Sequence, residues 1–381
     1  MDTIKLFYED AYIREFDAEL LSCQPEGDHF KAVLDRTAFF PEGGGQYGDI
    51  GYLGEARVLD TQERDGLIYH KVDREVPAGT VHGCLDWNVR FDRMQQHSGE
   101  HILSGLVHRR FGYNNVGFHL NDDYCVVDFD GPITRDEMRE MENEINLSVF
   151  QNQRINILYP DDEKLKKLDY RSKKEINGRV RLVEIEGTDL CACCAPHVRQ
   201  TGEIGLVKIV GQESHRGGVR LVMLAGSRAL KAYQHKQDQA KEIGAMLCAN
   251  EDLLTDAVRR MHEENQKLKY DLLGMEKKLM ISIAERVNID SNISLVFSPD
   301  LGKDQIRELV NLVLSRGARI CGAFSGDDRD GYRYVIGSKA QDVRKINEML
   351  KEKFSARGGG KPEMVQGSLS GTESEIKALL L

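Results

Sequence analysis

The stretch QQHSGEH (Gln95–His101) carries two histidines, His97 and His101, with three residues between them. Apolar residues recur at helical spacing from position 92 to position 111, which predicts a helix over this range. In a helix, side chains four residues apart lie on one face, about one turn from each other. We therefore expect the two imidazoles to point to the same side of this helix.

A second pair with the same spacing, Cys193 and His197, stands in CCAPH (193–197). Three imidazoles and one thiolate suit tetrahedral Zn²⁺ better than Ca²⁺ or Mg²⁺, which prefer oxygen. Cys191 and Cys194 flank Cys193, and the spacing alone does not choose among the three thiols. If the two halves meet in the fold, the chain holds a zinc site.

The composition bounds the class of protein. With 381 residues, 40% of them hydrophobic and 30% charged, we expect two to four domains of a soluble globular protein. No apolar run approaches the ~18 residues of a membrane helix. The start MDTIKLFYED has neither the basic nor the apolar region of a signal peptide. These features predict a cytoplasmic protein with no membrane partner.

The cysteine and charge patterns narrow the class further. Eight cysteines, five of them scattered, argue against a disulfide framework. A net charge of −10 disfavours nonspecific binding of nucleic acid. One local stretch is basic, KLKKLDYRSKKEINGRVR (164–181). It predicts either a solvated helix face or a surface for RNA.

The distribution of strand and helix signals predicts an α+β protein with four regions. Residues 1–88 are rich in short strand-like runs, as in a barrel-like domain, and residues 89–228 form an α+β domain that contains the metal residues. Residues 229–287 form a coiled-coil helical segment. Residues 288–381 form a small α/β domain.

An unbroken a/d heptad pattern runs through residues 254–279 and predicts a long helix that pairs with another helix. Its members alternate in steps of four and three, with one polar member, Asn265, of the kind that fixes register. The members are Leu254, Val258, Met261, Asn265, Leu268, Leu272, Met275 and Leu279. The partner helix is expected in a second copy of the chain, as a homodimer, or in another segment of the same chain.

Two glycine runs predict special backbone. Gly43, Gly44 and Gly45 in FFPEGGGQ allow a tight turn or close approach to a ligand. The run in ARGGGKP (356–362) predicts a loop whose backbone N–H groups, together with Lys361, meet an anion. An ordinary turn is the alternative in both places.

HSGEH also fits the pattern H-x-x-E-H of inverzincin peptidases, in which two histidines bind zinc and the glutamate is a base. A zinc peptidase is therefore one hypothesis, with Glu100 as its base. Such peptidases normally complete the site with a carboxylate. Here the best completing residues are Cys193 and His197, which weakens the peptidase hypothesis.

The order of several motifs resembles the alanyl-tRNA editing family, which comprises the editing domain of alanyl-tRNA synthetase and the free-standing AlaX proteins. The motifs that show this resemblance are FFPEGGGQ, W-x-x-R-x-x-x-M-Q-x-H-x-x-x-H (Trp87–His101), C-x-x-x-H, TGEIG (Thr201–Gly205) and GGVR (Gly217–Arg220). The coiled helix and the GGGKP-like sequence resemble the C-terminal DHHA1-type domain of the same family. The whole chain is thus similar to a long AlaX protein.

The resemblance implies a trans-editing enzyme that hydrolyses tRNA(Ala) wrongly charged with serine and, in some members, with glycine. A pocket built for alanine excludes glycine poorly and rejects an added hydroxyl weakly, so a second hydrolytic site is needed. By this resemblance the zinc ligands are His97, His101, Cys193 and His197. Zinc would activate a water, polarise the ester or orient the aminoacyl end. Attack of a metal-linked water on the ester carbonyl is the favoured mechanism.

Further site residues are expected on the same basis. Gln96 and Glu100 are expected near the reacting groups, although Glu100 is more typical of a residue that orients a histidine or lies on the helix surface. Substrate contacts are expected from Gly43, Gly44, Gly45, Thr201 and Gly202. Contacts to tRNA, through phosphates and shape, are expected from Lys166, Lys167, Arg171, Arg357 and Lys361.

Two positions depart from the family pattern. Cys194-Ala195-Pro196 replaces the more common Gly-Gly-Thr between the cysteine and histidine ligands, and Glu100 stands where many relatives carry glutamine. The lost threonine puts a hydroxyl contact in doubt. Because four protein ligands resemble a closed structural site, a noncatalytic tRNA-binding protein with a structural zinc is the remaining alternative.

Overall fold

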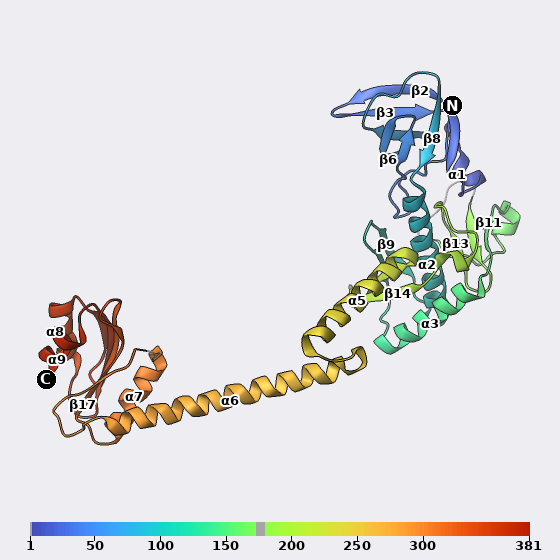
Figure 1. Ribbon diagram of the computed structural model, residues 1–381. Helices are drawn as coiled ribbons and strands as arrows, with labels where there is room; N and C mark the ends of the chain where they lie inside the picture. Colours follow the sequence, from blue (N-terminus) through green and yellow to red (C-terminus); the bar gives the residue numbers. More distant parts are fainter. Residues whose placement is uncertain (1, 173–179, 300) are drawn as a thin grey trace. The chain divides into compact units, whose positions relative to one another are not determined.

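The computed structural model describes residues 2–172, 180–299 and 301–381, and it confirms the expected α+β class (Figure 1). By its internal contacts the chain divides into two compact units, Met1–Glu242 and Ile243–Leu381. Within the described ranges, no helix has both the length and the apolar character needed to cross a membrane.

The first unit begins with a closed barrel in the strand order β2-β3-β7-β6-β5-β8. Alternate residues point inward, as the period of a strand requires, and Leu34, Leu53 and Val58 are completely buried in its core. The barrel strands are β2 (Glu15–Glu26), β3 (His29–Leu34), β5 (Gly51–Leu53), β6 (Ala56–Arg64), β7 (Leu67–Val72) and β8 (Thr80–Leu85). Beside the barrel lie β1 (Ile4–Lys5), α1 (Leu6–Glu9) and β4 (Arg36–Thr37).

Helix α2 (Trp87–Phe111) follows the barrel and is the central helix of the first unit (Figure 1). It begins where the Asp86 side chain accepts a hydrogen bond from the Val89 N–H. It ends at Gly112, which adopts a left-handed conformation with φ 73°. Most of its middle section is buried, so polar residues in that section need partners inside the protein.

Two sheets and a second helix surround α2. One sheet has the order β14-β15-β10-β9 and the other the order β11-β12-β13. The elements are β9 (Asn115–Leu120), β10 (Cys125–Phe129), α3 (Arg135–Gln151), β11 (Ile155–Leu158), α4 (Asp162–Leu165), β12 (Leu182–Ile185), β13 (Asp189–Ala192), the 3₁₀ helix η1 (Thr201–Ile204), β14 (Val207–His215) and β15 (Gly218–Ala225). Strand β13 leads directly into the cysteine and histidine of the second predicted pair.

The segment predicted as coiled coil contains two helices, α5 (Gly226–Leu247) and α6 (Leu254–Arg286), with the 3₁₀ helix η2 (Glu251–Leu253) between them. The first helix ends because Cys248 takes a left-handed conformation, φ 50°. The heptad pattern lies entirely on α6. Leu254 is partly buried, but the members from Val258 to Leu279 are exposed, including Leu268 at 67% and Met275 at 67%, so most of the pattern is not buried within the described chain.

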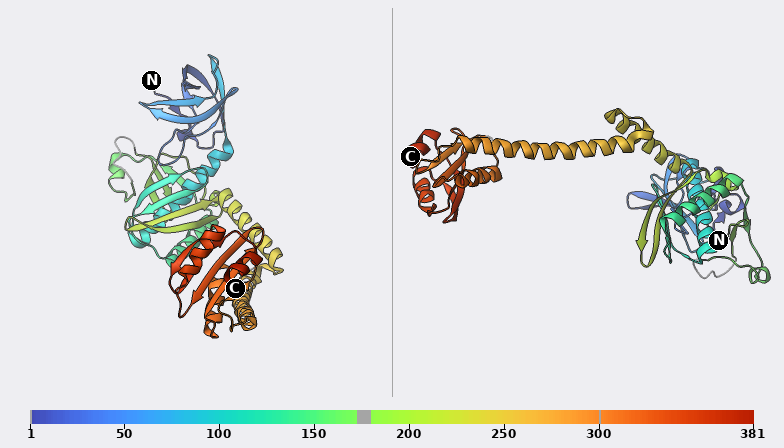
Figure 2. Two further views of the ribbon diagram at one scale, coloured as in Figure 1. Left: turned by 90° about the vertical axis from the view of Figure 1, so that its left-hand side faces the viewer. Right: turned by 90° about the horizontal axis from the view of Figure 1, so that it is seen from below.

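The second unit is a sheet in the order β16-β17-β18-β20-β19, with helices on both faces (Figure 2). Helix α7 packs on one face, against Cys321, Ala323 and Val335. Helices α8 and α9 pack on the other, against Phe324 and Tyr334. The elements are β16 (Ser294–Phe297), α7 (Lys303–Ser315), β17 (Ile320–Asp327), β18 (Gly331–Ser338), α8 (Arg344–Phe354), β19 (Arg357–Lys361), β20 (Met364–Leu369) and α9 (Glu373–Leu380).

The prediction of an anion-binding loop at 356–362 is wrong, because these glycines form the edge strand β19. A Cβ added at Gly358 would lie 2.5 Å from the Tyr334 hydroxyl, which donates a hydrogen bond to Asn347 Oδ1 at 2.6 Å. Glycine is therefore required at position 358 so that the strand can cross this buried tyrosine.

Candidate metal centre

The two predicted pairs meet in the first unit. His97 and His101 project from the same face of α2, with ring centroids 5.4 Å apart. Cys193 Sγ lies 3.5 Å from His97 Nε2 and 3.4 Å from His197 Nε2. One ligand atom from each of the four residues lies within 4.8 Å of the others. Residues almost a hundred positions apart thus form one compact cluster of donors.

Hydrogen bonds at the opposite ring nitrogens orient the histidines. Each Nδ1 atom lies at hydrogen-bonding distance from a different acceptor-type oxygen, which directs Nε2 toward the shared centre. The three pairs are His97 Nδ1–Gln46 Oε1 at 3.1 Å, His101 Nδ1–Asp189 Oδ2 at 3.0 Å and His197 Nδ1–Ser98 Oγ at 3.0 Å. This arrangement is typical of histidines that bind a metal through the other nitrogen.

Burial shifts the pKa values of two of the four donors, Cys193 and His197. It raises the pKa of the Cys193 thiol well above its usual range, and it lowers the pKa of His197 well below its usual value, helped by the neighbouring His101 and His97. A neutral imidazole is the form that binds metal, whereas the thiol must lose its proton. Three imidazole nitrogens and one sulfur therefore fit Zn²⁺, which would take the place of the thiol proton.

His97, His101 and Cys193 lie in the wall of a cavity of about 1220 Å³, whereas His197 belongs to the same cluster but does not line the cavity. This volume is large for a small-molecule site, since such pockets usually hold ~300–1,000 Å³. The wall mixes aromatic, charged and glycine residues from several elements. Besides the metal residues, its members include Tyr8, Gly44, Gly45, Glu100, Asn115, Phe118, Tyr159, Arg171, Arg181, Cys191 and Cys194.

Glu100 is a buried carboxylate in the wall of this cavity, with 2% of its surface exposed. Its Oε1 atom accepts hydrogen bonds from the Ser104 hydroxyl and from the Asn115 amide. It is therefore not a helix-surface residue. These hydrogen bonds hold its carboxyl group at a fixed position in the cavity wall.

Gln96 has a structural contact rather than a place in the cavity wall. Its Nε2 donates to the Ala225 carbonyl at 2.8 Å, and its Oε1 accepts from the Ala225 N–H at 2.7 Å. This pair of bonds holds α2 against the end of β15. The expectation that Gln96 acts beside the reacting groups does not fit this position.

Thr201 and Gly202 also lie away from the cavity wall. The Thr201 hydroxyl donates to the Ser148 carbonyl at 2.7 Å and accepts from the Gln153 N–H at 2.9 Å. A Cβ added at Gly202 would lie 2.3 Å from Asn152 Oδ1. The TGEIG sequence thus builds a tight junction with the end of α3, and it does not provide the expected substrate contacts.

The first glycine run approaches the metal centre closely. Gly44 and Gly45 have φ angles of 62° and 85°, and both line the cavity. A Cβ added at Gly45 would lie 2.5 Å from the Phe118 carbonyl oxygen. Gly43 pairs with Gln46 in the turn and does not line the cavity. The run therefore brings backbone to the cavity and positions Gln46 against His97.

The residues expected to contact tRNA fall into separate groups. Lys166 and Lys167 are exposed beside α4, whereas the Arg171 guanidinium lies in the cavity wall and pairs with Asp189. Arg357 and Lys361 are exposed on β19 of the second unit. The remainder of the basic stretch, 173–179, lies outside the described residues.

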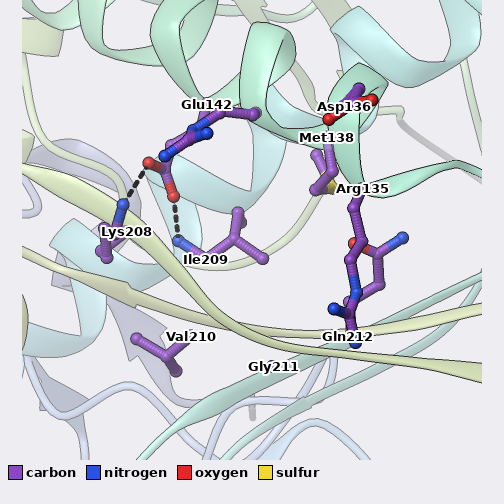
Figure 3. A pocket seen from close by; sticks show the side chains of 10 residues that line it. Arg135, Asp136, Met138, Glu142, Lys208, Ile209, Val210, Gly211 and Gln212 are labelled. Carbon is purple, nitrogen blue, oxygen red and sulfur yellow. Dashed lines mark hydrogen bonds and ion pairs between the residues drawn. The ribbon is translucent and has the colours of Figure 1, made fainter. Parts of the chain in front are cut away.

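A second hollow of about 480 Å³ lies between α3 and β14 (Figure 3). There Glu142 accepts hydrogen bonds from Lys208 Nζ at 2.5 Å and from the Ile209 N–H at 2.7 Å (Figure 3). These bonds satisfy the carboxylate, and the residues that line this hollow include no histidine or cysteine. Among the described residues, both groups of side chains that could hold a metal include His101, in the wall of the larger cavity.

Sequence reasoning missed several residues of the site. Gln46, Ser98 and Asp189 hold the three histidines, and Arg181 lines the cavity, where its Nη1 donates to the Cys193 and Ala195 carbonyls at 2.7 and 3.1 Å. Gln46 follows the glycine run, and Ser98 follows His97 directly, so nearness in sequence was the only signal. Asp189 carries no such signal, because its partner is a residue of α2.

Several known proteins and two family models are similar to this chain. Residues 180–222 match the model of the threonyl and alanyl tRNA synthetase second additional domain, and residues 9–89 match that of class II (A) tRNA synthetases. Alanyl-tRNA editing protein Aarsd1 of Danio rerio is 28% identical over 97% of this chain and 95% of its own length. The same-named protein of Rattus norvegicus is 27% identical over 98% and 97%.

Alanine--tRNA ligase of Thermococcus kodakarensis is 31% identical over 97% of this chain, but the match spans only 42% of that ligase. The similarity thus extends along nearly the whole chain in proteins of two sizes, and the shorter ones match it from end to end. Over nearly its whole length the chain is therefore similar to proteins of the AlaX-type alanyl-tRNA editing family.

Proposed function

We propose that this protein is a trans-editing hydrolase that deacylates mischarged tRNA(Ala), chiefly Ser-tRNA(Ala), with Gly-tRNA(Ala) as a second substrate. The observation that carries the proposal is the convergence of three imidazoles and one thiol at a large cavity, with His97, His101 and Cys193 in its wall. The relatives that match the chain from end to end are named as alanyl-tRNA editing proteins.

The proposed cofactor is Zn²⁺, held by His97, His101, Cys193 and His197. When bound, zinc supplies Lewis acidity that polarises an ester carbonyl and acidifies water. The chain's own residues do the rest: Gln46, Ser98 and Asp189 orient the imidazoles. Glu100 places negative charge in the wall, which favours a cationic aminoacyl group over a neutral one.

The cavity has room for more than an amino acid. Its volume of about 1220 Å³ would also accept the terminal nucleotide of the tRNA. Tyr8 and Tyr159 line it, and the Arg181 guanidinium lies 5.5 Å from the Tyr8 ring centroid. Aromatic and guanidinium groups are the usual partners of an unstacked base. These residues support binding of the terminal adenosine beside the metal centre.

Further contacts to tRNA are proposed on both units. Lys166 and Lys167 are exposed near the cavity-lining segment of the first unit. In the second unit, Arg333, Ser368 and Arg357 pair side by side across β18, β20 and β19, and all three are exposed. Lys361 follows on the same edge strand. Because these contacts address phosphates, binding should weaken steeply with salt.

A homodimer through α6 is proposed as the assembly. The helix has 33 residues, and its heptad members from Val258 to Leu279 are exposed, with Leu272 at 58% and Leu279 at 56%. A continuous exposed a/d row is typical of a helix that pairs with an identical one. In a parallel pair, Asn265 would face its own copy, which would satisfy both amides.

Deacylation of Ser-, Gly- and Ala-tRNA(Ala), with and without a chelator, tests the proposal. We expect hydrolysis of the first two, loss of activity with chelator and recovery on addition of Zn²⁺. His97→Ala should abolish hydrolysis while tRNA binding persists. His119→Ala is the matched control, because His119 is exposed on β9 and does not line the cavity. A folded His97→Ala protein that still deacylates Ser-tRNA(Ala) would rule out the zinc mechanism.

A further inference from the structure

We propose that Asp189 and Arg171 are positioning residues of the metal centre, which together fix the tautomer and orientation of His101. This inference rests on the proposed zinc site. It gives Arg171 a role in the cavity wall in place of the tRNA contact expected from the sequence.

The three side chains form a continuous buried chain. Asp189 Oδ2 lies 3.0 Å from His101 Nδ1, and its side chain is only 1% exposed. Arg171 grips the same carboxylate with both donors, Nε to Oδ1 at 2.7 Å and Nη2 to Oδ2 at 2.8 Å. A bidentate pair of this kind holds the carboxylate in one orientation. The oxygen that faces His101 is therefore fixed by the guanidinium.

The backbone holds both ends of this chain of contacts. The Arg171 N–H donates to the Leu190 carbonyl and its own carbonyl accepts from the Ala192 N–H, both at 2.9 Å, so Arg171 extends the sheet beside β13. On the other side, a Cβ at Gly105 would lie 2.5 Å from the Thr188 carbonyl oxygen. Glycine at this position lets α2 approach β13 closely enough for Asp189 to reach His101, one turn earlier on the helix.

His101 differs from the other two histidines in the charge of its partner. His97 meets an amide oxygen of Gln46 and His197 meets the Ser98 hydroxyl, which are both neutral. A carboxylate accepts only, so it requires the proton on Nδ1 and leaves the Nε2 lone pair for a metal. It also raises the basicity of the ligand. Of the three orienting contacts, that of Asp189 should thus affect metal affinity most.

The test compares Asp189→Asn with Asp128→Asn in the full chain. Asp128 is an ideal control because Arg220 grips it with the same geometry, 2.7 and 2.8 Å, and it contacts none of the four metal residues. An amide has one acceptor oxygen and one donor N–H₂ group, and the N–H₂ group would face either Arg171 Nε or His101 Nδ1 and Arg171 Nη2. It therefore cannot keep all three contacts that the carboxylate accepts. Zn²⁺ affinity is measured by competition with a chromophoric chelator, and the ligand field by the visible spectrum of the Co²⁺ form.

We expect Asp189→Asn to weaken Zn²⁺ binding by ~10–100-fold and to shift the Co²⁺ bands, with Asp128→Asn unchanged in both. Arg171→Lys should weaken binding in the same direction. Equal affinities and spectra for the two Asn variants would overturn the inference while leaving the zinc site intact. A wild-type chain that does not bind Zn²⁺ would refute the site and the inference together.

A second measurement needs no substitution and remains available if Asp189→Asn does not fold. Long-range ¹H–¹⁵N spectra of the histidine-labelled, zinc-loaded chain report which ring nitrogen carries the proton. The inference requires the His101 proton on Nδ1. A proton on Nε2 of His101 would overturn it.

Discussion

Replacement of Arg90 by methionine should destabilise the first unit strongly. Arg90 is 1% exposed on α2, and it donates to Asp49 through Nε at 2.8 Å and again through Nη2. It also donates to the Ala11 carbonyl at 2.9 Å and to the Ala38 carbonyl at 2.6 Å. Asp49 in turn accepts from the Phe40 N–H at 2.6 Å. One guanidinium thus holds both ends of the segment that carries the glycine run.

The magnitude follows from what the substitution leaves behind. Methionine fills much of the volume but leaves Asp49, which is 1% exposed, as a buried charge without its cation. Removal of one partner of a buried pair costs ~3–5 kcal/mol. Replacing both residues, as Arg90→Met with Asp49→Leu, removes the orphaned charge. The double variant should still lose stability, because the Phe40 N–H and two backbone carbonyls lose partners at about 1–3 kcal/mol each.

The chain contains a suitable reporter for this experiment. Trp87 is the only tryptophan. It lies three residues before Arg90 and packs against Tyr12 at 5.4 Å and Phe91 at 5.7 Å between ring centroids. Its fluorescence during urea denaturation therefore reports unfolding of the first unit alone. Arg74→Met is the control, since its ion pair with Asp73 is exposed, and it should leave the urea midpoint unchanged.

If Arg90→Met lowered the free energy of unfolding by less than about 1 kcal/mol, the reasoning would be refuted. A buried carboxylate that has lost its cation should destabilise the fold by more than that. If Arg90→Met destabilises the first unit as expected, an effect on the metal centre should follow. The glycine run and Gln46 lie between Phe40 and Asp49, so Arg90→Met should also weaken Zn²⁺ binding through the loosened contact of Gln46 with His97.

Three further predictions concern the metal, the glycine run and the assembly. Burial raises the pKa of the Cys193 thiol, so Zn²⁺ uptake at pH 7 should release about one proton. The affinity for Zn²⁺ should therefore fall as the pH falls. Calorimetry in buffers of different ionisation enthalpy measures the number of protons released. Gly45→Ala should lower the free energy of unfolding in urea by about 1–3 kcal/mol, because it strains a backbone with φ 85° and crowds the Phe118 carbonyl. An unchanged urea midpoint would contradict the close approach of Gly45 to Phe118. Leu272→Glu should give a monomer by light scattering, whereas Leu273→Glu, equally exposed but off the heptad row, should remain dimeric.

The sequence was most informative where a pattern repeats locally. The helix around His97 and His101 and the helix of the heptad pattern both appear in the structure, because helical spacing of apolar residues depends only on the local chain. The same local reasoning failed at residues 357–361. A glycine run is compatible with a loop or a strand. Only the fold shows that Gly358 approaches the buried Tyr334 hydroxyl and that Gly360 approaches the Met364 carbonyl.

In the metal centre too, some residues could be predicted from local sequence and others could not. Four candidate donors could be chosen from the sequence because both pairs share one spacing, and the resemblance to a family selected Cys193 among three thiols. In the structure only His97 and His101 lie on a helix, whereas Cys193 and His197 lie in irregular chain after β13. The roles of Gln96 and Thr201 could not be chosen in this way. Both are buried polar residues whose hydrogen bonds go to distant backbone groups, Ala225 and Ser148, and such partners become visible only in the folded chain.

The sequence by itself indicated the α+β class, the two pairs of candidate metal donors and the heptad pattern of α6, because these depend on residue type and short-range spacing. Only the tertiary structure brought Asp189 and Arg171 to His101. It also placed Arg171, which was expected to contact tRNA, in the wall of the cavity. The physical reason is that a buried charged group needs a partner nearby in the folded protein. The number of residues between two positions in the sequence does not tell how far apart their side chains lie in the fold.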